Sequence, residues 1–563
     1  MYNLAETILI QGGFSQNLFI MKKILFSFAL ALTTVCAYSQ IRIDWQQCYG
    51  SMGNDRATRM VKKPHGYWIA GCVTEQSGMV TIPVLNRSWV IGIDETGGLV
   101  DEISLGPYAV QIDEDMFGGI NEGVFYALGH PKNELENEQL GIKKLDANGH
   151  VVWETIVGCT NESFVNSLRC GTSAPDGGVI ASTSVQSAGG DITNHYGLDD
   201  VWVVKIDSLG RLEWETTLGT ENREWPQCFV NASDGGCYVG MIGNPGFVGS
   251  VPVCQVPPTE EGDVLFGKLD SAGHLLWLHC YGGSMPDIID HVIELEDGFL
   301  LVCDTQSDDR DVEGAGYHVG NGPNRTHDVW LIRTDYDGNI VWSRCYGGTC
   351  TDFPIKAFQN EDGGFTVFCH TLSIDGDVQS AQNLQIPEDY HYYSRLWVFR
   401  IDAEGNLLWE RAIGTRFSEV EPKDVIKLSD TEYTILATVE LLPGEGFEGD
   451  FSCTNWDDRF CDCESYWVLH ITDIFDYNSV EEGMVEETSV SIYPNPTRGL
   501  LSITGKGLKQ LYLYDLLGQK VATVPSYNGI NAMVDTSGFA AGIYLARVYV
   551  GNGVCVKRVV VTK

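Results

Sequence analysis

The chain is poor in positive charge. Its 563 residues include 36 lysines and arginines against 76 aspartates and glutamates, a formal net charge of −40. Nucleic-acid binding relies on a basic surface that displaces counterions from phosphates, so this composition argues against a nucleic-acid partner. The charge is unevenly spread, because residues 486–563 carry a net charge of +4 and residues 1–485 therefore carry −44. The C-terminal segment is a compositionally separate module.

The sequence also lacks the short motifs of common catalytic and metal sites. It contains no glycine-rich phosphate loop, no HExxH helix motif and no GxSxG elbow, and none of its 17 cysteines forms a CxxC pair. We therefore assign no catalytic residue and no cofactor-binding residue, and a zinc site is disfavoured. Whether the protein has an enzymatic activity stays open at this point.

Long apolar runs are missing except for a short one near the N-terminus. Met21-Lys22-Lys23 precedes an apolar stretch from Ile24 to Val35, and small residues follow it up to Gln40. This pattern predicts a secretory signal peptide at residues 21–39, with residues 1–20 interpreted as a mis-assigned start. No later segment is long enough to cross a bilayer as a helix, so we expect no transmembrane helix in the mature chain.

Export would place the cysteines in an oxidising compartment, where disulfides persist. Cys228 and Cys237 flank an apparent hairpin turn at residues 232–236. The sequence therefore predicts that these two cysteines face each other and form a disulfide.

A repeat of about sixty residues dominates the first 470 residues. In each copy an Asp is followed by Gly three residues later and by Trp seven residues later, as in Asp207, Gly210 and Trp214. A copy at Asp94 and Gly97 has Asp101 in place of the Trp. Glycine in such a turn supplies a positive φ, and the flanking alternation predicts a hairpin. The other copies begin at Asp146, Asp270, Asp335 and Asp402.

A second kind of hairpin lies between these turns, as at Glu361 to Phe365, and seven such hairpins can be counted. The pattern therefore predicts that each repeat forms four short antiparallel strands, which is the number of strands in one propeller blade. The last repeat lacks its fourth strand, whereas residues 43–50 resemble an unpaired fourth strand. We predict an all-β fold in which residues 40–473 form a seven-bladed β-propeller closed by the N-terminal strand, leaving no bare edge.

The C-terminal segment has its own pattern. Residues 474–487 are acidic and patternless, which indicates a linker, and alternating strands follow. Tyr493-Pro494-Asn495-Pro496, with Gly499 after it, forms a rigid bend, and Gly518-Gln519 and Gly542-Ile543-Tyr544 follow in order. These motifs predict a small β-sandwich over residues 488–563.

In this order at the C-terminus, the motifs resemble the type A sorting domain of the type IX secretion system of Bacteroidetes. The resemblance implies that Tyr493, Pro494, Asn495, Pro496, Gly499, Gly518, Gly542 and Tyr544 belong to a sorting signal. It further implies that the partners are the secretion machinery and a surface peptidase that removes the domain. The protein would then be exported through the periplasm and either secreted or held at the outer-membrane surface.

The longest loops join the second and third strands of the repeats, and they define the candidate ligand face. Aromatic candidates for contact with a glycan or protein ligand are Tyr196, Tyr317, Tyr390, Tyr392, Tyr393 and Trp456. Acidic clusters in the same loops are weak candidates for calcium binding, with solvated turns as the alternative: Asp308, Asp309, Asp311, Asp375 and Asp377. The loops also hold His195, His318, His327 and His391, for which a metal role is disfavoured.

The leading functional hypothesis is a secreted or cell-surface, non-catalytic binding protein of the adhesin kind with an unknown ligand. A polysaccharide-active surface enzyme is the alternative, because propellers host both binding proteins and enzymes, and a passive structural surface cargo is a third possibility. A catalytic pair would be two carboxylates facing each other in one concave pocket, one of them with a raised pKa.

Overall fold

A computed structural model of the chain describes two compact units, which span Ile41–Asp473 and Ile474–Lys563. It describes residues 40–562 except for positions 52, 75, 84–87, 106–115, 119–124, 130–138, 159–164, 244–246, 249–250, 253–261, 320–325, 385–393, 415–417, 442–463, 475–489, 496, 506–507, 515–519, 526–530, 540–541 and 551–552. Each unit is described by itself.

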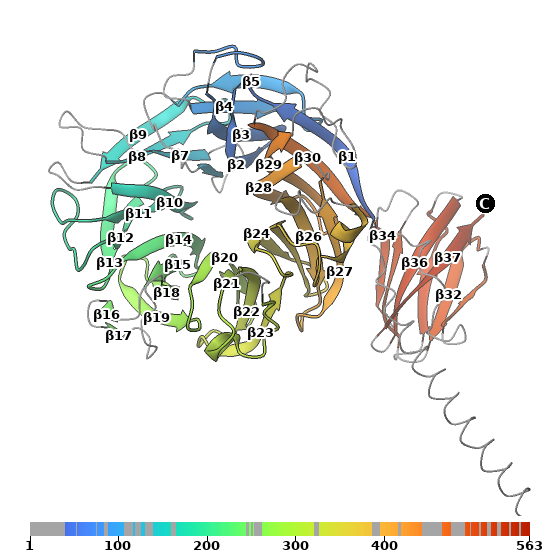
Figure 1. Cartoon of the computed structure of the whole chain (residues 1–563). Helices are drawn as coiled ribbons and strands as arrows, with labels where there is room; N and C mark the ends of the chain where they lie inside the picture. Colours follow the sequence, from blue (N-terminus) through green and yellow to red (C-terminus); the bar gives the residue numbers. More distant parts are fainter. Residues whose placement is uncertain are drawn as a thin grey trace, which may run out of the picture. The chain divides into compact units, whose positions relative to one another are not determined.

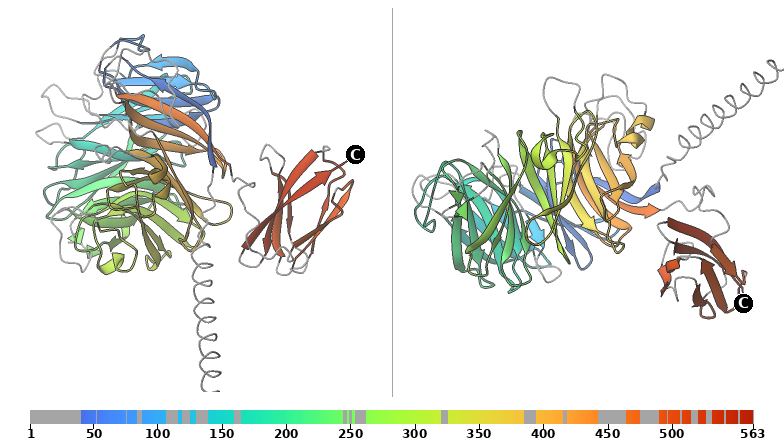
Figure 2. Two further views of the ribbon diagram at one scale, coloured as in Figure 1. Left: turned by 45° about the vertical axis from the view of Figure 1, so that its right-hand side comes forward. Right: turned by 90° about the horizontal axis from the view of Figure 1, so that it is seen from below.

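The first unit consists of four-stranded antiparallel sheets, seven of them among its described residues, which follow one another in chain order around a common centre (Figures 1 and 2). We number these sheets 1 to 7. Sheets 1 to 3 contain β2 (Arg56–Lys63), β3 (Gly66–Cys72), β4 (Ser88–Ile93) and β5 (Leu99–Ile103); β6 (Met116–Gly118), β7 (Phe125–Gly129), β8 (Leu140–Leu145) and β9 (Val151–Val157); and β10 (Val165–Ser173), β11 (Val179–Val185), β12 (Asp200–Ile206) and β13 (Leu212–Leu218).

Sheets 4 to 7 repeat this plan, and their innermost strands are β14, β20, β24 and β28 (Figure 1). Their strands are β14 (Glu224–Asn231), β15 (Cys237–Gly243), β18 (Asp263–Leu269) and β19 (Leu275–Tyr281); β20 (Asp287–Leu295), β21 (Gly298–Thr305), β22 (Asp328–Thr334) and β23 (Ile340–Tyr346); β24 (Asp352–Gln359), β25 (Phe365–Thr371), β26 (Arg395–Ile401) and β27 (Leu407–Ile413); and β28 (Ser418–Lys427), β29 (Glu432–Leu441), β30 (Glu464–Ile474) and β1 (Gln40–Tyr49). A small hairpin, β16 (Phe247–Val248) and β17 (Val251–Pro252), stands apart.

Helix is scarce in the described residues. They contain two short 3₁₀ turns, η2 (Arg310–Val312) and η3 (Gln379–Leu384). In these parts of the chain, no helix has the length and apolar character needed to cross a membrane. The expected all-β, propeller-like fold is confirmed.

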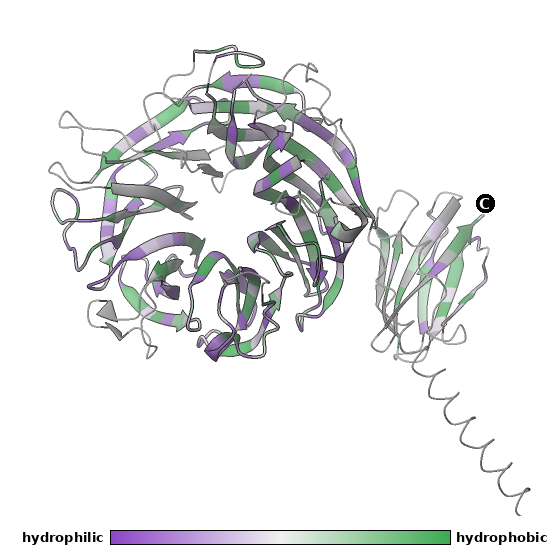
Figure 3. Ribbon diagram, viewed as in Figure 1, coloured by the Kyte–Doolittle hydropathy of each residue, from purple (hydrophilic) through white to green (hydrophobic). Residues whose placement is uncertain are grey.

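The hydrophobic core lies between neighbouring sheets rather than at one centre. Strands β11, β12 and β22 are buried along their whole length, because each sheet is covered by another sheet on both faces. The outermost strands are partly exposed, as in β23. Figure 3 shows hydrophobic stretches along the strands, with hydrophilic stretches interspersed. One core cluster joins sheets 7 and 1, where Tyr466 and Val468 pack with Trp89 and Ile91.

The repeated Asp-x-x-Gly turn joins the third and fourth strands of a sheet. In sheet 4, Asp270 Oδ1 accepts hydrogen bonds from the backbone N–H groups of Ala272 and His274, both at 2.9 Å. Gly273 has φ +83°, a conformation that side-chain-bearing residues rarely adopt. The Asp and the Gly of the repeat therefore fix the local shape of the turn.

The Trp of the repeat has a different role, because it binds the turn of the next sheet. In sheets 2, 3 and 5 this Trp lies on the outermost strand, and its indole Nε1 donates to the backbone carbonyl of the residue two positions before the turn glycine. The donor–acceptor pairs are Trp153 and Ser208 (3.1 Å), Trp214 and Ser271 (3.1 Å), and Trp342 and Ala403 (3.0 Å). The spacing between repeats thus reflects contacts between sheets.

Three positions depart from this pattern. In sheet 4, the Trp277 ring packs edge-to-face against Phe266, with 5.5 Å between the ring centroids. In sheet 1 the Trp position holds Asp101, and Trp68 Nε1 from the second strand donates to Ala147 O at 3.3 Å instead. In sheet 6, Trp409 is buried and its Nε1 has no partner among the residues that the structure describes. Sheet 7 has no Asp-x-x-Gly turn to accept from it, since its fourth strand, β1, comes from the N-terminal part of the chain.

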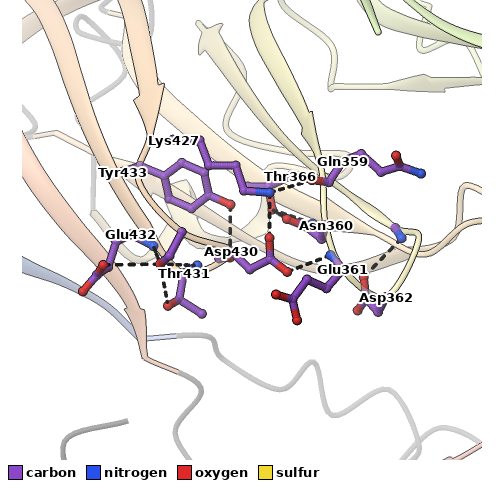
Figure 4. A network of polar contacts seen from close by, with 12 residues as sticks. Gln359, Asn360, Glu361, Asp362, Thr366, Lys427, Asp430, Thr431, Glu432 and Tyr433 are labelled. Carbon is purple, nitrogen blue, oxygen red and sulfur yellow. Dashed lines mark hydrogen bonds and ion pairs between the residues drawn. The ribbon is translucent and has the colours of Figure 1, made fainter. Parts of the chain in front are cut away.

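Sheets 6 and 7 are joined on the side of their first hairpin turns (Figure 4). Asp430 Oδ2 accepts from Glu361 N at 2.7 Å, and Lys427 Nζ donates to Gln359 O at 2.5 Å. Lys427 Nζ also lies 2.7 Å from Asp430 Oδ1. Asp430 therefore holds the first hairpin turns of sheets 6 and 7 together.

The predicted disulfide between Cys228 and Cys237 is wrong. Both thiols are free and buried. Cys237 directly follows the turn and pairs with Asn231, whereas Cys228 lies further from the turn and pairs with Gly240, so the two cysteines do not face each other. Cys48 and Cys280, at matching positions of β1 and β19, are each disulfide-bonded.

The second unit packs two antiparallel sheets around one core. The core includes Leu501, Ile503, Leu511, Val548 and Val559. A three-stranded sheet has the order β31–β32–β35, and a four-stranded sheet has the order β34–β33–β36–β37. The strands are β31 (Val490–Tyr493), β32 (Leu500–Gly505), β33 (Leu508–Tyr514), β34 (Lys520–Pro525), β35 (Asn531–Asp535), β36 (Gly542–Val550) and β37 (Gly553–Val561).

Candidate ligand face and sorting segment

Acidic loop residues attach the long loops to the loops that enter the same sheet. In sheet 5, Asp309 Oδ1 accepts from Ser284 N at 2.8 Å, and Asp311 Oδ2 accepts from Gly282 N at 3.1 Å. Arg310 adds a bond from its guanidinium to Gly283 O at 2.6 Å. The loop between the second and third strands therefore lies beside the entering loop, on one face.

Sheet 6 repeats this arrangement at the equivalent residues. Asp375 Oδ1 accepts from Thr349 N at 2.7 Å, and Asp377 Oδ2 accepts from Gly347 N at 3.3 Å. Four of the five weak calcium candidates thus bind backbone amides, and the fifth, Asp308, is exposed. Among the described residues, no three or more His, Cys, Asp or Glu side chains are grouped so as to hold a metal ion.

A buried carboxylate lies under each of these loop pairs. Asp352, at the start of β24, is fully buried and accepts from Gly348 N at 2.8 Å, from Ser373 Oγ at 2.7 Å and from the Thr371 hydroxyl. Asp287 and Glu224 occupy the same place in sheets 5 and 4, and both are fully buried. Burial raises the pKa of each of the three carboxyls to about 7.

These carboxylates do not have the geometry of a catalytic pair in an open pocket. The Asp352 carboxyl lies near that of Asp328, since the two flank Gly347, but both side chains are fully buried. The same pairing recurs for Asp263 and Asp287 around Gly282. Burial and repetition in successive sheets are typical of a structural element of the repeat rather than of one active site.

Three of the four loop histidines lie against acidic residues. His318 Nδ1 is 2.8 Å from Asp328 Oδ2, and this hydrogen bond raises the pKa of His318. His327 Nδ1 is 2.5 Å from Asp304 Oδ1, and His195 Nε2 is 3.6 Å from the buried Asp200. His391 lies outside the described residues. These pairs fix the loops further, and the sequence pattern alone did not indicate them.

The aromatic candidates of the ligand face divide into two groups. Tyr196 is 45% exposed, and its backbone N–H is held by Asp200 Oδ2 at 2.5 Å. Tyr317 packs against the core between sheets 4 and 5 and donates its hydroxyl to Thr326 O at 2.6 Å. Tyr390, Tyr392, Tyr393 and Trp456 lie outside the described residues. Tyr196 is therefore the described candidate that solvent reaches most freely.

The innermost strands hold a further set of residues that the strand patterns did not predict. Six of these strands, β2, β10, β14, β20, β24 and β28, have a bulge where they pair with the second strand of their sheet. The first residue after the register shift is, in the same order, Arg59, Cys170, Cys228, His291, Lys356 and Asp424. Pro226, Pro354 and Pro422 directly precede the shift in three sheets. Since proline inside a sheet is confined to edges and bulges, these prolines were a usable signal.

In the second unit the bend residues are attached to the last strand. Asn495 Oδ1 accepts from Val560 N at 2.8 Å, and the Tyr493–Pro494 peptide bond is cis. Gly499 O accepts from Thr536 N at 2.9 Å, and Gly542 pairs with Val561. Tyr544 is buried in the core, whereas Tyr493 is 77% exposed. Pro496 and Gly518 lie outside the described residues.

Comparison with known protein families identifies this segment. Residues 491–562 match the family described as a secretion system C-terminal sorting domain. The C-terminal segment is therefore a type IX secretion sorting domain, as its motifs predicted. The protein is a cargo that the type IX secretion machinery handles and that is exported to the cell surface or secreted. No curated protein matches the chain.

Solved structures resemble the chain only distantly. A puromycin hydrolase mutant aligns with 10% identity and a TM-score of 0.39 over 69% of this chain and 51% of its own, so this chain spans about half of that hydrolase. The WD40 domain of SCAP from fission yeast aligns with 8% identity and a TM-score of 0.31 over 78% and 99% of the two chains. A duf4221 family member from Bacteroides vulgatus aligns with 8% identity and a TM-score of 0.31 over 78% of this chain and 100% of its own. No activity follows from likenesses this weak.

Proposed function

We propose that the protein is a cell-surface or secreted binding protein whose first unit is a closed, seven-bladed β-propeller. In this proposal residues 21–39 are a signal peptide, residues 474–487 are a linker, and the sorting domain is removed by a surface peptidase in a Bacteroidetes host. The ligand is a glycan or a protein, and it binds on the face formed by the long loops.

Closure is supported by contacts that cross from sheet 7 to sheet 1. Tyr49 of β1 donates its hydroxyl to Gly97 O in the turn of sheet 1 at 2.5 Å. Equivalent bonds join other neighbours, as Tyr281 donates to Gly338 O at 2.8 Å. The sheet 7 to sheet 1 contact is thus made in the same way as an internal contact.

The observation that carries the binding proposal is the repeated attachment of the long loops. Asp309 and Asp311 in sheet 5 bind the entering loop as Asp375 and Asp377 do in sheet 6. Loops held rigidly on one face of a scaffold lose little conformational entropy on binding, which favours recognition.

A glycan array probed with the purified full chain, with and without calcium, tests this proposal. Tyr196→Ala should weaken binding to any glycan that the array identifies at least tenfold. Tyr336 is the matched control, because it is 46% exposed but lies in an Asp-x-x-Gly turn rather than in a long loop. Tyr336→Ala should leave binding unchanged.

Two other results would contradict the proposal. Hydrolysis of a bound glycan would identify a polysaccharide-active enzyme instead. Absence of binding to the glycan array and to extracellular matrix proteins would support a passive structural cargo.

A further inference from the structure

The second unit exposes large hydrophobic side chains on one face of its three-stranded sheet. Among the side chains that the structure describes in this unit, the exposed large hydrophobic ones are Tyr493, Leu500 and Met533, at 77%, 55% and 56%. They come from β31, β32 and β35, the three strands of that sheet. We call these three residues the apolar patch.

The strand register places the residues of the apolar patch next to one another. Ser502 of β32 pairs with Tyr493 on one side and with Met533 on the other. Leu500 lies two residues before Ser502 and therefore on the same face of the sheet. This makes Leu500 a diagonal neighbour of both Tyr493 and Met533, at the distance of about 7–8 Å that long side chains can bridge. The patch is thus continuous across all three strands.

The apolar patch lies outside the core of its unit. The residues that alternate with it along the strands pack in that core or against it: Ile492, Leu501, Ile503, Ala532 and Val534. Side chains that stay more than half exposed remove little apolar area from water on folding, so they contribute little to stability. A continuous exposed apolar patch on a water-soluble unit is typical of an interaction site.

The backbone that carries Tyr493 is fixed by the bend that follows it. Asn495 Oδ1 accepts from Val560 N, Thr497 N donates to Val560 O, and Thr562 N donates to Thr497 O, each at 2.8 Å. The bend is therefore attached to β37 and its C-terminal end at several points, while the Tyr493 side chain reaches solvent. A side chain presented on a fixed backbone loses little conformational entropy when it binds.

Charge favours an acidic partner for this face. Arg498 is exposed two residues before Leu500, and within the part of the chain that the structure describes it forms no ion pair. Asp535, which pairs with Leu500, accepts from Ser537 N at 3.0 Å in its own turn. Residues 486–563 carry a net charge of +4, whereas the remaining residues carry −44. An acidic surface would therefore attract the sorting domain and repel the rest of the chain.

We propose that the apolar patch is the surface by which the sorting domain docks on a protein of the type IX secretion machinery, and that the docking surface of that protein is apolar with an acidic rim. The family match supports this occupant, because residues 491–562 match a secretion system sorting domain and contain the whole patch. Tyr, Met and Arg, the residue types found here, are enriched at protein interfaces. The proposal rests on the sorting domain and is independent of the proposed ligand face.

Photo-crosslinking in cells with a working type IX secretion system tests the occupant of the patch. The full chain carries a photoreactive benzoylphenylalanine in place of Met533, and mass spectrometry identifies the crosslinked product. We expect a component of the secretion machinery. The same photoreactive group in place of Leu276, which is 53% exposed on β19 of the first unit, should not give this product. A product with a second copy or with the chain's own first unit would overturn the proposal, as would the lack of any product.

Surface delivery tests whether the patch is needed. The full chain with Leu500→Thr and Met533→Thr should show at least a tenfold smaller protease-accessible fraction on intact cells, with the protein retained in the periplasm. Leu276→Thr is the matched control, because it removes an equally exposed leucine outside the sorting domain, and its delivery should equal that of the unchanged chain.

Chemical denaturation of the purified double variant shows whether its second unit still folds. If it does not, Arg498→Glu decides the question, because this variant leaves the apolar patch intact and should lower the surface fraction at least threefold by repelling an acidic partner. Normal delivery of a folded double variant would overturn the proposal. So would an equal loss of delivery in Leu276→Thr, or normal delivery of Arg498→Glu where the double variant does not fold.

Discussion

The indole Nε1 of Trp467 donates a hydrogen bond to Oε1 of Gln46 at 3.0 Å, across 421 residues of sequence. In other sheets the same Trp of the third strand donates to a residue of the fourth strand 13 positions later. The pairs are Trp89 and Glu102, Trp202 and Glu215, Trp330 and Ser343, and Trp397 and Glu410. In sheet 7, Gln46 of the N-terminal strand therefore accepts the bond that a residue 13 positions after the Trp accepts in those four sheets.

Removing this acceptor should destabilise the first unit. Gln46→Ala takes the side-chain acceptor away from a fully buried indole, and we expect a loss of about 1 kcal/mol in the free energy of unfolding. The measurement is denaturant unfolding followed by tryptophan fluorescence. Gln47→Ala is the control, because the hydrogen bond that Gln47 makes within the described part of the chain is a long one, 3.4 Å to Cys48 O, and the variant should stay within about 0.5 kcal/mol of the unchanged chain. Equal effects of the two changes would show that the bond from Trp467 does not contribute.

A second prediction compares two glycine-to-alanine substitutions, in order to separate the cost of backbone strain in a turn from the cost of a clash between neighbouring sheets. Gly273 and Gly314 have φ of +83° and +79°, so alanine is strained at both. A Cβ at Gly273 would lie 2.5 Å from Trp214 Cε3 of the preceding sheet, whereas at Gly314 it would meet nothing within 4 Å. Gly273→Ala should therefore cost at least about 1 kcal/mol more than Gly314→Ala in chemical denaturation. Similar costs would contradict the packing of Trp214 on this turn.

A third prediction concerns pH. Burial raises the pKa of Asp352 to about 7 from an ordinary value of 3.8. Between these values the folded chain holds a proton that the unfolded chain releases, so this group's contribution to stability falls as pH rises from about 4 to about 7. Asp352→Asn cannot titrate, and its stability should decline less over this window than that of the unchanged chain.

The control for this experiment is Asp335→Asn. Asp335 lies in an Asp-x-x-Gly turn, where hydrogen bonds, first of all from Asn339, lower its pKa. Its contribution is present above its ordinary pKa and is lost at more acidic pH, so the substitution should not change the slope between pH 4 and 7. Unfolding curves at several pH values provide the test. An unchanged slope in Asp352→Asn would mean that this carboxyl does not hold a proton in the folded chain.

The sorting domain leads to a fourth prediction. Deletion of residues 488–563 should leave the first unit in the periplasm, because the segment that the secretion machinery handles is gone. Protease treatment of intact cells should then fail to degrade the truncated chain while it degrades the full chain. Fusion of residues 488–563 to an unrelated periplasmic protein is the reciprocal control, and it should expose that protein at the surface. Surface delivery of the truncated chain would refute the prediction.

Local features of the fold were predictable because they depend on neighbours in sequence. The Asp of each turn binds amides two and four residues away, and Gly273 supplies the positive φ, so the repeat pattern was readable directly. The sorting domain was equally readable, since its bend and turns occur in a fixed order. The Cys228 and Cys237 prediction failed because the two residues stand at different distances from the turn, so that the strand register pairs Cys237 with Asn231 and Cys228 with Gly240.

The sequence by itself therefore determined the repeat, the all-β class and the export route, because turn chemistry and strand alternation act over a few residues. Only the tertiary structure decided which distant residues meet: the bond from Trp467 to Gln46, the ion pair of Lys356 with Asp424, and the burial of Trp409 without a partner for its Nε1 among the described residues. These contacts join segments far apart in the chain. Their existence depends on how whole sheets pack, which no local pattern encodes.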